Sequence, residues 1–186
     1  MVIFGEAGLE LLKWLELPPA QGFAPDNWLE LLEAIGARIK EVDARIAEEV
    51  SASEEAQLLM TVPEVGRCFG LLIASDIGDI SRFPSAKHLC SYAGLVPSTR
   101  SSGGKTHYGR ITKQGSHWLR WAMVEAVVTA VGRPGTIRKY YLRMKARKGT
   151  NIARVATARK LLANIYHMLK ENKSFDEVMS ERGFSG

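Results

Sequence analysis

An apolar side chain recurs at alternating intervals of four and three residues between positions 28 and 46, and this repeat constrains the fold more than any other feature. The residues of the repeat are Trp28, Leu32, Ile35, Ile39, Val42 and Ile46. Such spacing keeps one side of a helix turned toward a partner helix and is typical of a coiled coil. It predicts a helix of about three heptads, which begins at Asn27 because Asn27 and Glu30 have the spacing of a capping box.

The partner of this predicted coiled-coil helix remains open at the level of sequence. One interpretation is self-association through residues 28–46, giving a homo-oligomer, or packing against a further domain. The other is an ordinary helical hairpin with the short amphipathic stretch Ile3 to Leu15. The segment Gln21–Pro25 between the two helices is predicted to be a linker.

Turn residues and helix caps divide the rest of the chain into further predicted helices. These are two short helices within residues 58–78, a short helix over 85–92, helices over 117–131 (capped by Ser116), 136–148 and 150–170, and a last helix from Ser174 with Glu177 as its capping partner. Residues 95–113 are rich in serine and glycine, and their second half is expected to form a small hairpin or an extended loop. We therefore expect a mainly α fold, with a helical N-terminal segment and coiled-coil connector over residues 1–57 and a compact helical domain over residues 58–186.

Residues 58–78 fit the helix-hairpin-helix pattern, in which a tight turn flanked by apolar side chains joins two helices. The turn contains Val62, Pro63, Val65 and Gly66. Its backbone amides and the N-terminus of the second helix suit a phosphate oxygen. Glu64 stands where the pattern prefers glycine, however, and a carboxylate there would repel a phosphate. Phosphate binding and a purely structural hairpin both remain open for this turn.

The sequence disfavours a membrane protein and an exported protein. Its longest nearly apolar run, Trp121 to Val131, contains Glu125 and is shorter than the roughly 18 residues that span a bilayer. The N-terminus is acidic where a secretory signal would be basic. Cys68 and Cys90 have no CxxC or metal-ligand spacing, so we expect reduced, structural thiols, no metal site and a cytoplasmic location.

The charged residues are sorted along the chain instead of being mixed. Residues 1–79 hold 5 Lys and Arg against 15 Asp and Glu, whereas residues 80–170 hold 18 Lys and Arg against the single carboxylate of Glu125. Unrelieved like charge destabilises a compact protein, so a polyanion is expected to bind residues 80–170. The alternative is that the acidic N-terminal third neutralises the basic region internally.

The basic region predicts a surface that holds nucleic-acid phosphates. Cations on its helices would provide affinity with little base specificity. The candidate cations of these helices are Arg138, Lys139, Arg143, Lys145, Arg147, Lys148, Arg154, Arg159 and Lys160. They cannot all share one helix face, so we expect some of them to point away from any single groove. Tyr140 and Tyr141 in the same segment are expected to pack or stack.

Five short motifs within residues 58–120 occur in an order that is characteristic of one family. The motifs are Leu-Met-Thr-Val-Pro-x-Val-Gly, Ile-Gly-Asp-Ile-x-Arg-Phe-Pro-Ser-Ala, Tyr-Ala-Gly-Leu-Val-Pro, Ser-Ser-Gly-Gly-Lys and Ile-Thr-Lys-Gln-Gly-Ser-x-Trp-Leu-Arg. Together they resemble the C-terminal transposase domain of the insertion-sequence one-ten and one-sixteen family. The resemblance continues through the basic helices to about residue 170, and the predicted coiled coil resembles the family's connector.

This resemblance implies DNA transposition or recombination, a serine that joins covalently to DNA during strand exchange, and a structured guide RNA as a second partner. Family members also have an N-terminal resolvase-like domain whose acidic residues hold magnesium. No strand pattern here gathers the acids of residues 1–79 around a metal. We therefore expect no cofactor in this chain, magnesium only together with that acidic domain, and no strand exchange by the chain alone.

The family pattern places the nucleophile at the serine directly before glycine, which is Ser102 here, with Ser101 as the alternative. Gly103 and Gly104 allow a phosphate to approach the backbone closely. Cations that can stabilise charge on the phosphate oxygens are Arg100, Lys105, Arg110, Lys113 and Arg120. His107 is the nearest titratable group for a general base, although a surface role is the simpler interpretation of this residue. For Tyr108, the simpler interpretation is an aromatic residue of the hairpin with no chemical role.

These features support a DNA-binding part of a transposase, and two other functions remain open. The chain is alternatively a non-catalytic nucleic-acid-binding regulator, or a truncated remnant, that competes with a complete enzyme. A third interpretation is a protein-interaction module organised by the heptad helix.

Overall fold

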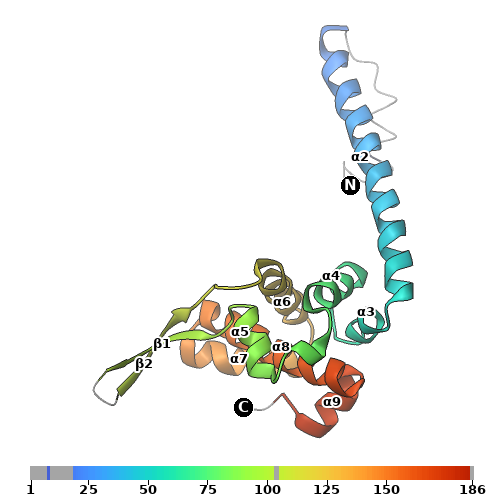
Figure 1. The fold of residues 1–186 in the computed structure, drawn as a ribbon. Coiled ribbons are helices and arrows are strands. Elements are labelled where there is room, and N and C mark those ends of the chain that lie inside the picture. Colours follow the sequence, from blue (N-terminus) through green and yellow to red (C-terminus); the bar gives the residue numbers. More distant parts are fainter. Residues whose placement is uncertain (1–7, 9–18, 103–104, 185–186) are drawn as a thin grey trace. The chain divides into compact units, whose positions relative to one another are not determined.

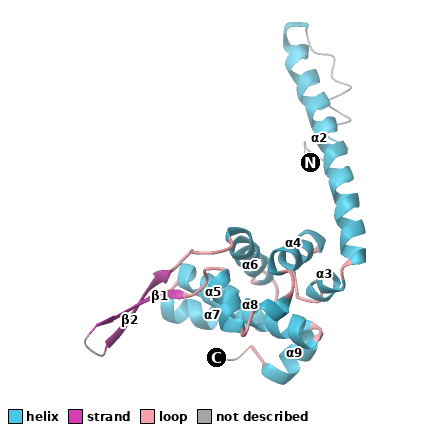
Figure 2. Ribbon diagram, viewed as in Figure 1, coloured by secondary structure: helices cyan, strands magenta, loops and turns pink. Residues whose placement is uncertain are grey.

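The computed structural model describes residue 8, residues 19–102 and residues 105–184 (Figures 1 and 2). The chain divides into two compact units, residues 1–47 and residues 48–186. The described part of the chain is mainly α, as predicted, with one small two-stranded sheet. None of its helices is both long enough and apolar enough to cross a membrane.

The helix of the heptad repeat, α2 (Pro19–Ala52), begins earlier than predicted. The linker prediction for Gln21–Pro25 is wrong because these residues are helical, and Asn27 therefore lies inside the helix instead of capping it. Lengthening an existing helix avoids the cost of nucleation, and Pro19 occupies the first position, where its missing N–H costs nothing. Apart from residue 8, the predicted helix Ile3 to Leu15 falls outside the described residues.

The second unit contains seven α-helices, a 3₁₀ turn and a β-hairpin within the described residues. They are α3 (Glu54–Leu59), α4 (Arg67–Ile77), η1 (Ile80–Arg82), α5 (Ala86–Tyr92), β1 (Pro97–Ser102), β2 (Lys105–Ile111), α6 (His117–Ala130), α7 (Thr136–Lys148), α8 (Thr150–Glu171) and α9 (Phe175–Arg182). The predicted caps of α6 and α9 are confirmed. Ser116 accepts a hydrogen bond from the amide of Leu119, and Ser174 and Glu177 form a capping box.

Helix α8 is the centre of the core, because α3, α5, α6, α7 and α9 all pack against it. Its buried residues include Leu161, Leu162 and Ile165, none of which has an exposed surface. Cys90 on α5 is buried beside it, and its thiol donates to the carbonyl of Arg159 over 3.5 Å. Burial raises the pKa of that thiol to about 11, so Cys90 stays protonated and unreactive. Cys68 is also a free cysteine, but it is exposed.

The β-hairpin projects from the helical body, and its base is fixed to the end of α5 (Figure 1). The amide of Ser116 donates to the carbonyl of Tyr92 over 2.8 Å, and the amide of Thr112 donates to the carbonyl of Val96 over 2.9 Å. Gly115, with φ of +99°, brings the backbone so close to Tyr92 that a Cβ would collide with the Tyr92 carbonyl oxygen. This glycine sets the path from β2 into α6.

Candidate nucleic-acid interface

Helix α7 presents a stripe of cations on its outer side. Ile137 and Tyr141 are buried and turn one side of the helix toward the core. Lys139, Arg143 and Arg147 follow one another at intervals of four residues, which places them on one helix face, and all three are exposed. The segment Thr136–Lys148 contains no Asp or Glu. A row of exposed cations on one helix face is an arrangement that suits phosphate binding.

The other predicted cations of α7 have different settings. Lys145 and Lys148 are exposed, at other angles around the helix axis. Arg138 is half-buried, and its Nη1 lies 3.5 Å from the carbonyl oxygen of Gly132. The guanidinium of Arg143 lies over the ring of Tyr140 at 5.2 Å, which restrains its direction. The predicted cations are therefore divided between several faces, in agreement with the expectation from sequence.

The candidate serine segment forms the hairpin. Strands β1 and β2 are antiparallel, with Ser102 opposite Lys105 and Ser101 opposite Thr106 at the end far from the helices. Arg100, opposite His107, lies one pair closer to the helical body. Only the backbone is described for residues 99–102, 105–108 and 110, which include the candidate side chains of Arg100, Ser101, Ser102, Lys105, His107, Tyr108 and Arg110. Both serines therefore lie at the end of β1, directly before Gly103 and Gly104 in the sequence.

Two predicted cations mark the other end of the hairpin. Lys113 is exposed and has a left-handed backbone, with φ of +56°. Arg120 is half-buried, and its Nη1 donates to the carbonyls of Ala93 and Lys113 over 3.0 and 3.2 Å. This arginine ties the loop before α6 to the end of α5, a structural role that sequence reasoning did not identify because the contact joins distant segments.

The predicted helix-hairpin-helix turn lies between α3 and α4. Val62 and Val65 are buried, whereas Pro63 and Gly66 are exposed, and Gly66 caps α4 without a side-chain hydrogen bond. Glu64 takes the left-handed conformation that glycine would favour, with φ of +67°. Its carboxylate lies 2.9 Å from Nη1 of Arg133, in the loop between α6 and α7. The acidic side chain of the turn is therefore neutralised by a cation of the basic region.

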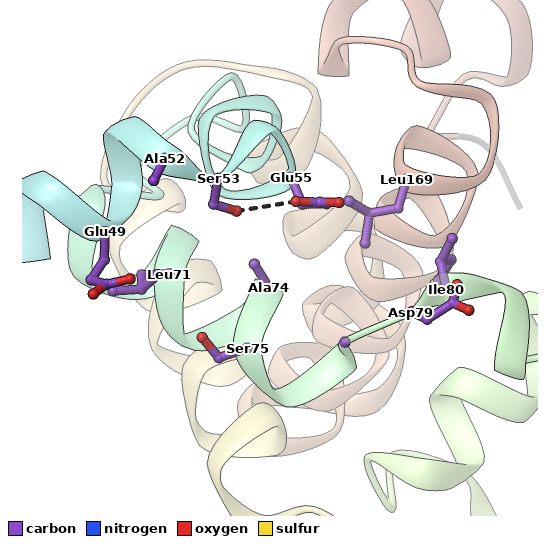
Figure 3. A pocket seen from close by; sticks show the side chains of 11 residues that line it. Glu49, Ala52, Ser53, Glu55, Leu71, Ala74, Ser75, Asp79, Ile80 and Leu169 are labelled. Carbon is purple, nitrogen blue, oxygen red and sulfur yellow. Dashed lines mark hydrogen bonds between the residues drawn. The ribbon is translucent and has the colours of Figure 1, made fainter.

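A pocket in the second unit has the opposite charge. It has a volume of about 550 Å³ and lies between the end of α2, helices α3 and α4, and the end of α8 (Figure 3). Glu49, Glu55 and Asp79 line it, and Glu55 accepts a hydrogen bond from Ser53 over 3.1 Å. Among the described residues, no three His, Cys, Asp or Glu side chains lie close enough to hold a metal ion. An anionic ligand would be repelled here, so the pocket lies outside the candidate interface.

Comparison with known proteins shows that the chain is similar to insertion-sequence transposases and to a pilin gene-inverting protein. Residues 56–142 match the Transposase IS116/IS110/IS902 family. The chain is 36% identical over 150 residues to the pilin gene-inverting protein of Moraxella bovis, covering 77% of this chain and 47% of that protein. It is 30% identical over 145 residues to the 44.8 kDa protein of insertion element IS116 of Streptomyces clavuligerus, covering 77% and 36%. It is 26% identical over 165 residues to the transposase for insertion sequence element IS1328 of Yersinia enterocolitica, covering 83% and 49%. The chain spans less than half the length of these relatives.

Proposed function

Because residues 56–142 place this chain in the IS116/IS110/IS902 transposase family, we propose that it provides the DNA-binding surface and the serine nucleophile of a transposase. DNA is the main ligand in this proposal, and a structured guide RNA is the second. The observation that carries the proposal is the stripe of exposed cations on α7, within a region of 18 Lys and Arg and one carboxylate. The relative from Moraxella bovis, a pilin gene-inverting protein, supports a role in rearranging DNA.

The turn between α3 and α4 is proposed as a second phosphate contact. The amides at the N-terminus of α4 carry partial positive charge, and Gly66 leaves them uncovered by a capping side chain. The ion pair of Glu64 with Arg133 removes the repulsion that an unpaired carboxylate would exert on a phosphate. Val62 and Val65 hold the turn in place from the core side.

The proposed nucleophile is Ser102, with Ser101 as the alternative. Ser102 directly precedes Gly103 and Gly104 in the sequence, and its backbone is paired with that of Lys105 in the hairpin. In the proposed step the serine oxygen bonds to phosphorus while the bond to one bridging oxygen breaks, and the serine proton passes to the departing oxygen. The described residues offer no metal cluster to assist this step, so the magnesium-binding acidic domain of the family is proposed to act together with this chain.

A trapping experiment tests the proposed serine. The chain is mixed with a nicked DNA substrate, magnesium and the acidic domain of a relative, and the protein–DNA adduct is measured on a denaturing gel. We expect an adduct with the wild-type chain and with Ser101→Ala, and none with Ser102→Ala, because only Ser102 supplies the attacking oxygen. DNA binding is unchanged in all three. An adduct formed by Ser102→Ala would contradict the assignment.

The same experiment without the acidic domain tests whether the chain is sufficient. We expect neither strand cleavage nor an adduct with magnesium alone, because phosphoryl transfer at such sites needs metal ligands that the described residues do not gather. Cleavage by the wild-type chain that is lost in Ser102→Ala would show that the chain is a complete enzyme. DNA binding that Ser102→Ala leaves unchanged, with no adduct under any condition, would favour the non-catalytic regulator.

Self-association through α2 is proposed for the first unit. The seam residues Trp28, Ile39 and Val42 are 65%, 56% and 53% exposed, so the described part of the chain does not cover them. Their heptad spacing fits a second copy of the same helix. The predicted alternative partner, the stretch Ile3 to Leu15, lies almost wholly outside the described residues.

A single substitution tests this association. Ile39→Glu places a carboxylate in the seam, and burying such a charge without a partner costs several kcal/mol. We expect it to weaken self-association by about a hundredfold or more, measured as the change from oligomer to monomer by light scattering. Ala37→Glu is the matched control, since Ala37 is exposed and lies off the seam. A wild-type chain that is monomeric at high concentration would contradict the proposal.

A further inference from the structure

Helix α6 turns two tryptophans toward solvent. Trp118 is 59% exposed and Trp121 is 42% exposed, whereas Leu119, Ala122 and Met123 on the same helix are fully buried. A tryptophan gains more from burial than almost any other side chain, so two exposed ones within one helical turn indicate a surface that contacts something else.

The two tryptophans belong to a series of rings whose geometry is fixed. Phe69 on α4 meets Trp121 with ring centroids 5.4 Å apart, and Trp121 meets Trp118 at 6.1 Å. His117 meets Trp118 at 5.3 Å. All three contacts are edge-to-face, with interplanar angles of 63°, 84° and 77°. The rings therefore support one another, and binding a ligand costs little side-chain entropy. We call Phe69, Trp121, Trp118 and His117 the aromatic series.

The charges around the aromatic series favour a nucleic acid as its occupant. Arg67 begins α4 two residues before Phe69, and Lys113 precedes α6 by four residues; both are exposed. The carboxylate on α6 belongs to Glu125, which is half-buried one turn beyond Trp121 and farther from Trp118. Exposed aromatic rings and cations on the surface of the same unit are the two features by which proteins bind single strands, since the rings stack on unpaired bases and the cations hold phosphates.

The position of the aromatic series agrees with this occupant. Helix α6 begins six residues after β2 ends, and the loop between them is fixed by Arg120 and by the Ser116–Tyr92 hydrogen bond. The series thus follows directly on the base of the hairpin that carries Ser102. Bases in an intact duplex are covered by their neighbours, so a stacking surface on the protein takes only unpaired bases.

From these observations we infer that Trp118 and Trp121 form a stacking site for the unpaired bases of a single-stranded segment of nucleic acid. The inference rests on the proposed function, because the phosphates of the same strand are held by the basic region. The stacking site adds a contact with the bases to the contacts that the basic region makes with the phosphates. Unpaired bases of DNA and of RNA share this chemistry, and the experiment contains an arm for each.

The test compares strands with and without bases. Affinity of the full chain is measured for a thymidine oligonucleotide, for an abasic oligonucleotide of the same length, for a uridine oligonucleotide and for a duplex. We expect the wild-type chain to prefer the thymidine strand over the abasic strand by about tenfold or more. Trp118→Ala removes most of this preference, Trp118→Phe retains it, and neither changes duplex affinity by more than about twofold. The matched control is Ile152→Ala, which removes a similarly exposed apolar side chain, 56% exposed, from α8.

Each other result has a definite meaning. If wild type binds the duplex but binds thymidine and abasic strands equally, the stacking site is wrong and the proposed function stands. If the preference survives in Trp118→Ala, or if that variant instead changes the mass of the protein in light scattering, the tryptophans serve another purpose and the inference is overturned. If wild type binds no probe at all, the proposed function itself fails. Tighter binding of the uridine oligonucleotide than of the thymidine oligonucleotide would identify RNA as the preferred source of the bases.

Discussion

Replacing Lys139, Arg143 and Arg147 together by glutamine is expected to weaken duplex binding by the full chain by about a hundredfold at low salt. The three side chains share the exposed face of α7, and each contact between a cation and a phosphate releases a counterion. Glutamine keeps helix propensity close to that of lysine and arginine, so the helix itself is preserved. Fluorescence anisotropy at several salt concentrations measures the affinity and also its salt dependence, whose slope should decrease by about three.

The matched control for this variant lies on α2. Arg38, Lys40 and Arg45 are also three exposed cations on one helix, but Arg38 and Arg45 each pair with Glu41 over 2.8 and 3.1 Å. Their replacement by glutamine changes the net charge by the same amount, and we expect it to alter affinity by no more than about threefold. Equal losses in both variants would mean that binding follows total charge, and the assignment of α7 as the interface would be wrong.

Gly115→Ala is expected to destabilise the second unit by roughly 3 kcal/mol or more. Alanine is strained at the left-handed φ of +99°, and its Cβ would collide with the carbonyl oxygen of Tyr92. The same oxygen accepts the hydrogen bond from the amide of Ser116. The link between the hairpin and α6 must therefore shift. Thermal unfolding followed by circular dichroism should show a midpoint lower by about 10 °C.

Gly135 provides the control for this substitution. It is exposed, its φ of 166° is ordinary extended backbone, and no atom lies within 4 Å of the position of a Cβ. We expect Gly135→Ala to change the free energy of unfolding by less than about 1 kcal/mol, because alanine also restricts the unfolded chain. A similar midpoint for the two variants would contradict the close approach between Gly115 and Tyr92.

Local signals in the sequence predicted the helices well. Ser116 and the Ser174–Glu177 box each begin a helix where expected, and Gly78 ends α4 with φ of +57°. Such caps act within one turn, so neighbouring residues suffice to reveal them. The linker prediction for Gln21–Pro25 was wrong because these turn-forming residues extend a helix that is already nucleated. The family resemblance predicted from the motifs of residues 58–120 is confirmed.

The candidate interface was harder to predict because its details depend on contacts between distant segments. Sequence gives the cations of α7 but not the pairing of Arg133 with Glu64, or the use of Arg120 as a backbone anchor. The aromatic series was missed for the same reason, since Phe69 lies about fifty residues from Trp121 in the chain. The interval of three residues between Trp118 and Trp121 was the one available signal, and in most helices it indicates a core face.

The salt dependence of duplex affinity tests the central claim, that residues 80–170 lie against a phosphate backbone. If six to eight of their cations contact phosphates, affinity measured by filter binding should fall by about a thousandfold or more between about 50 and 200 mM salt. Affinity that does not vary with salt, or failure to retain duplex, single-stranded and folded RNA probes at low ionic strength, would contradict it.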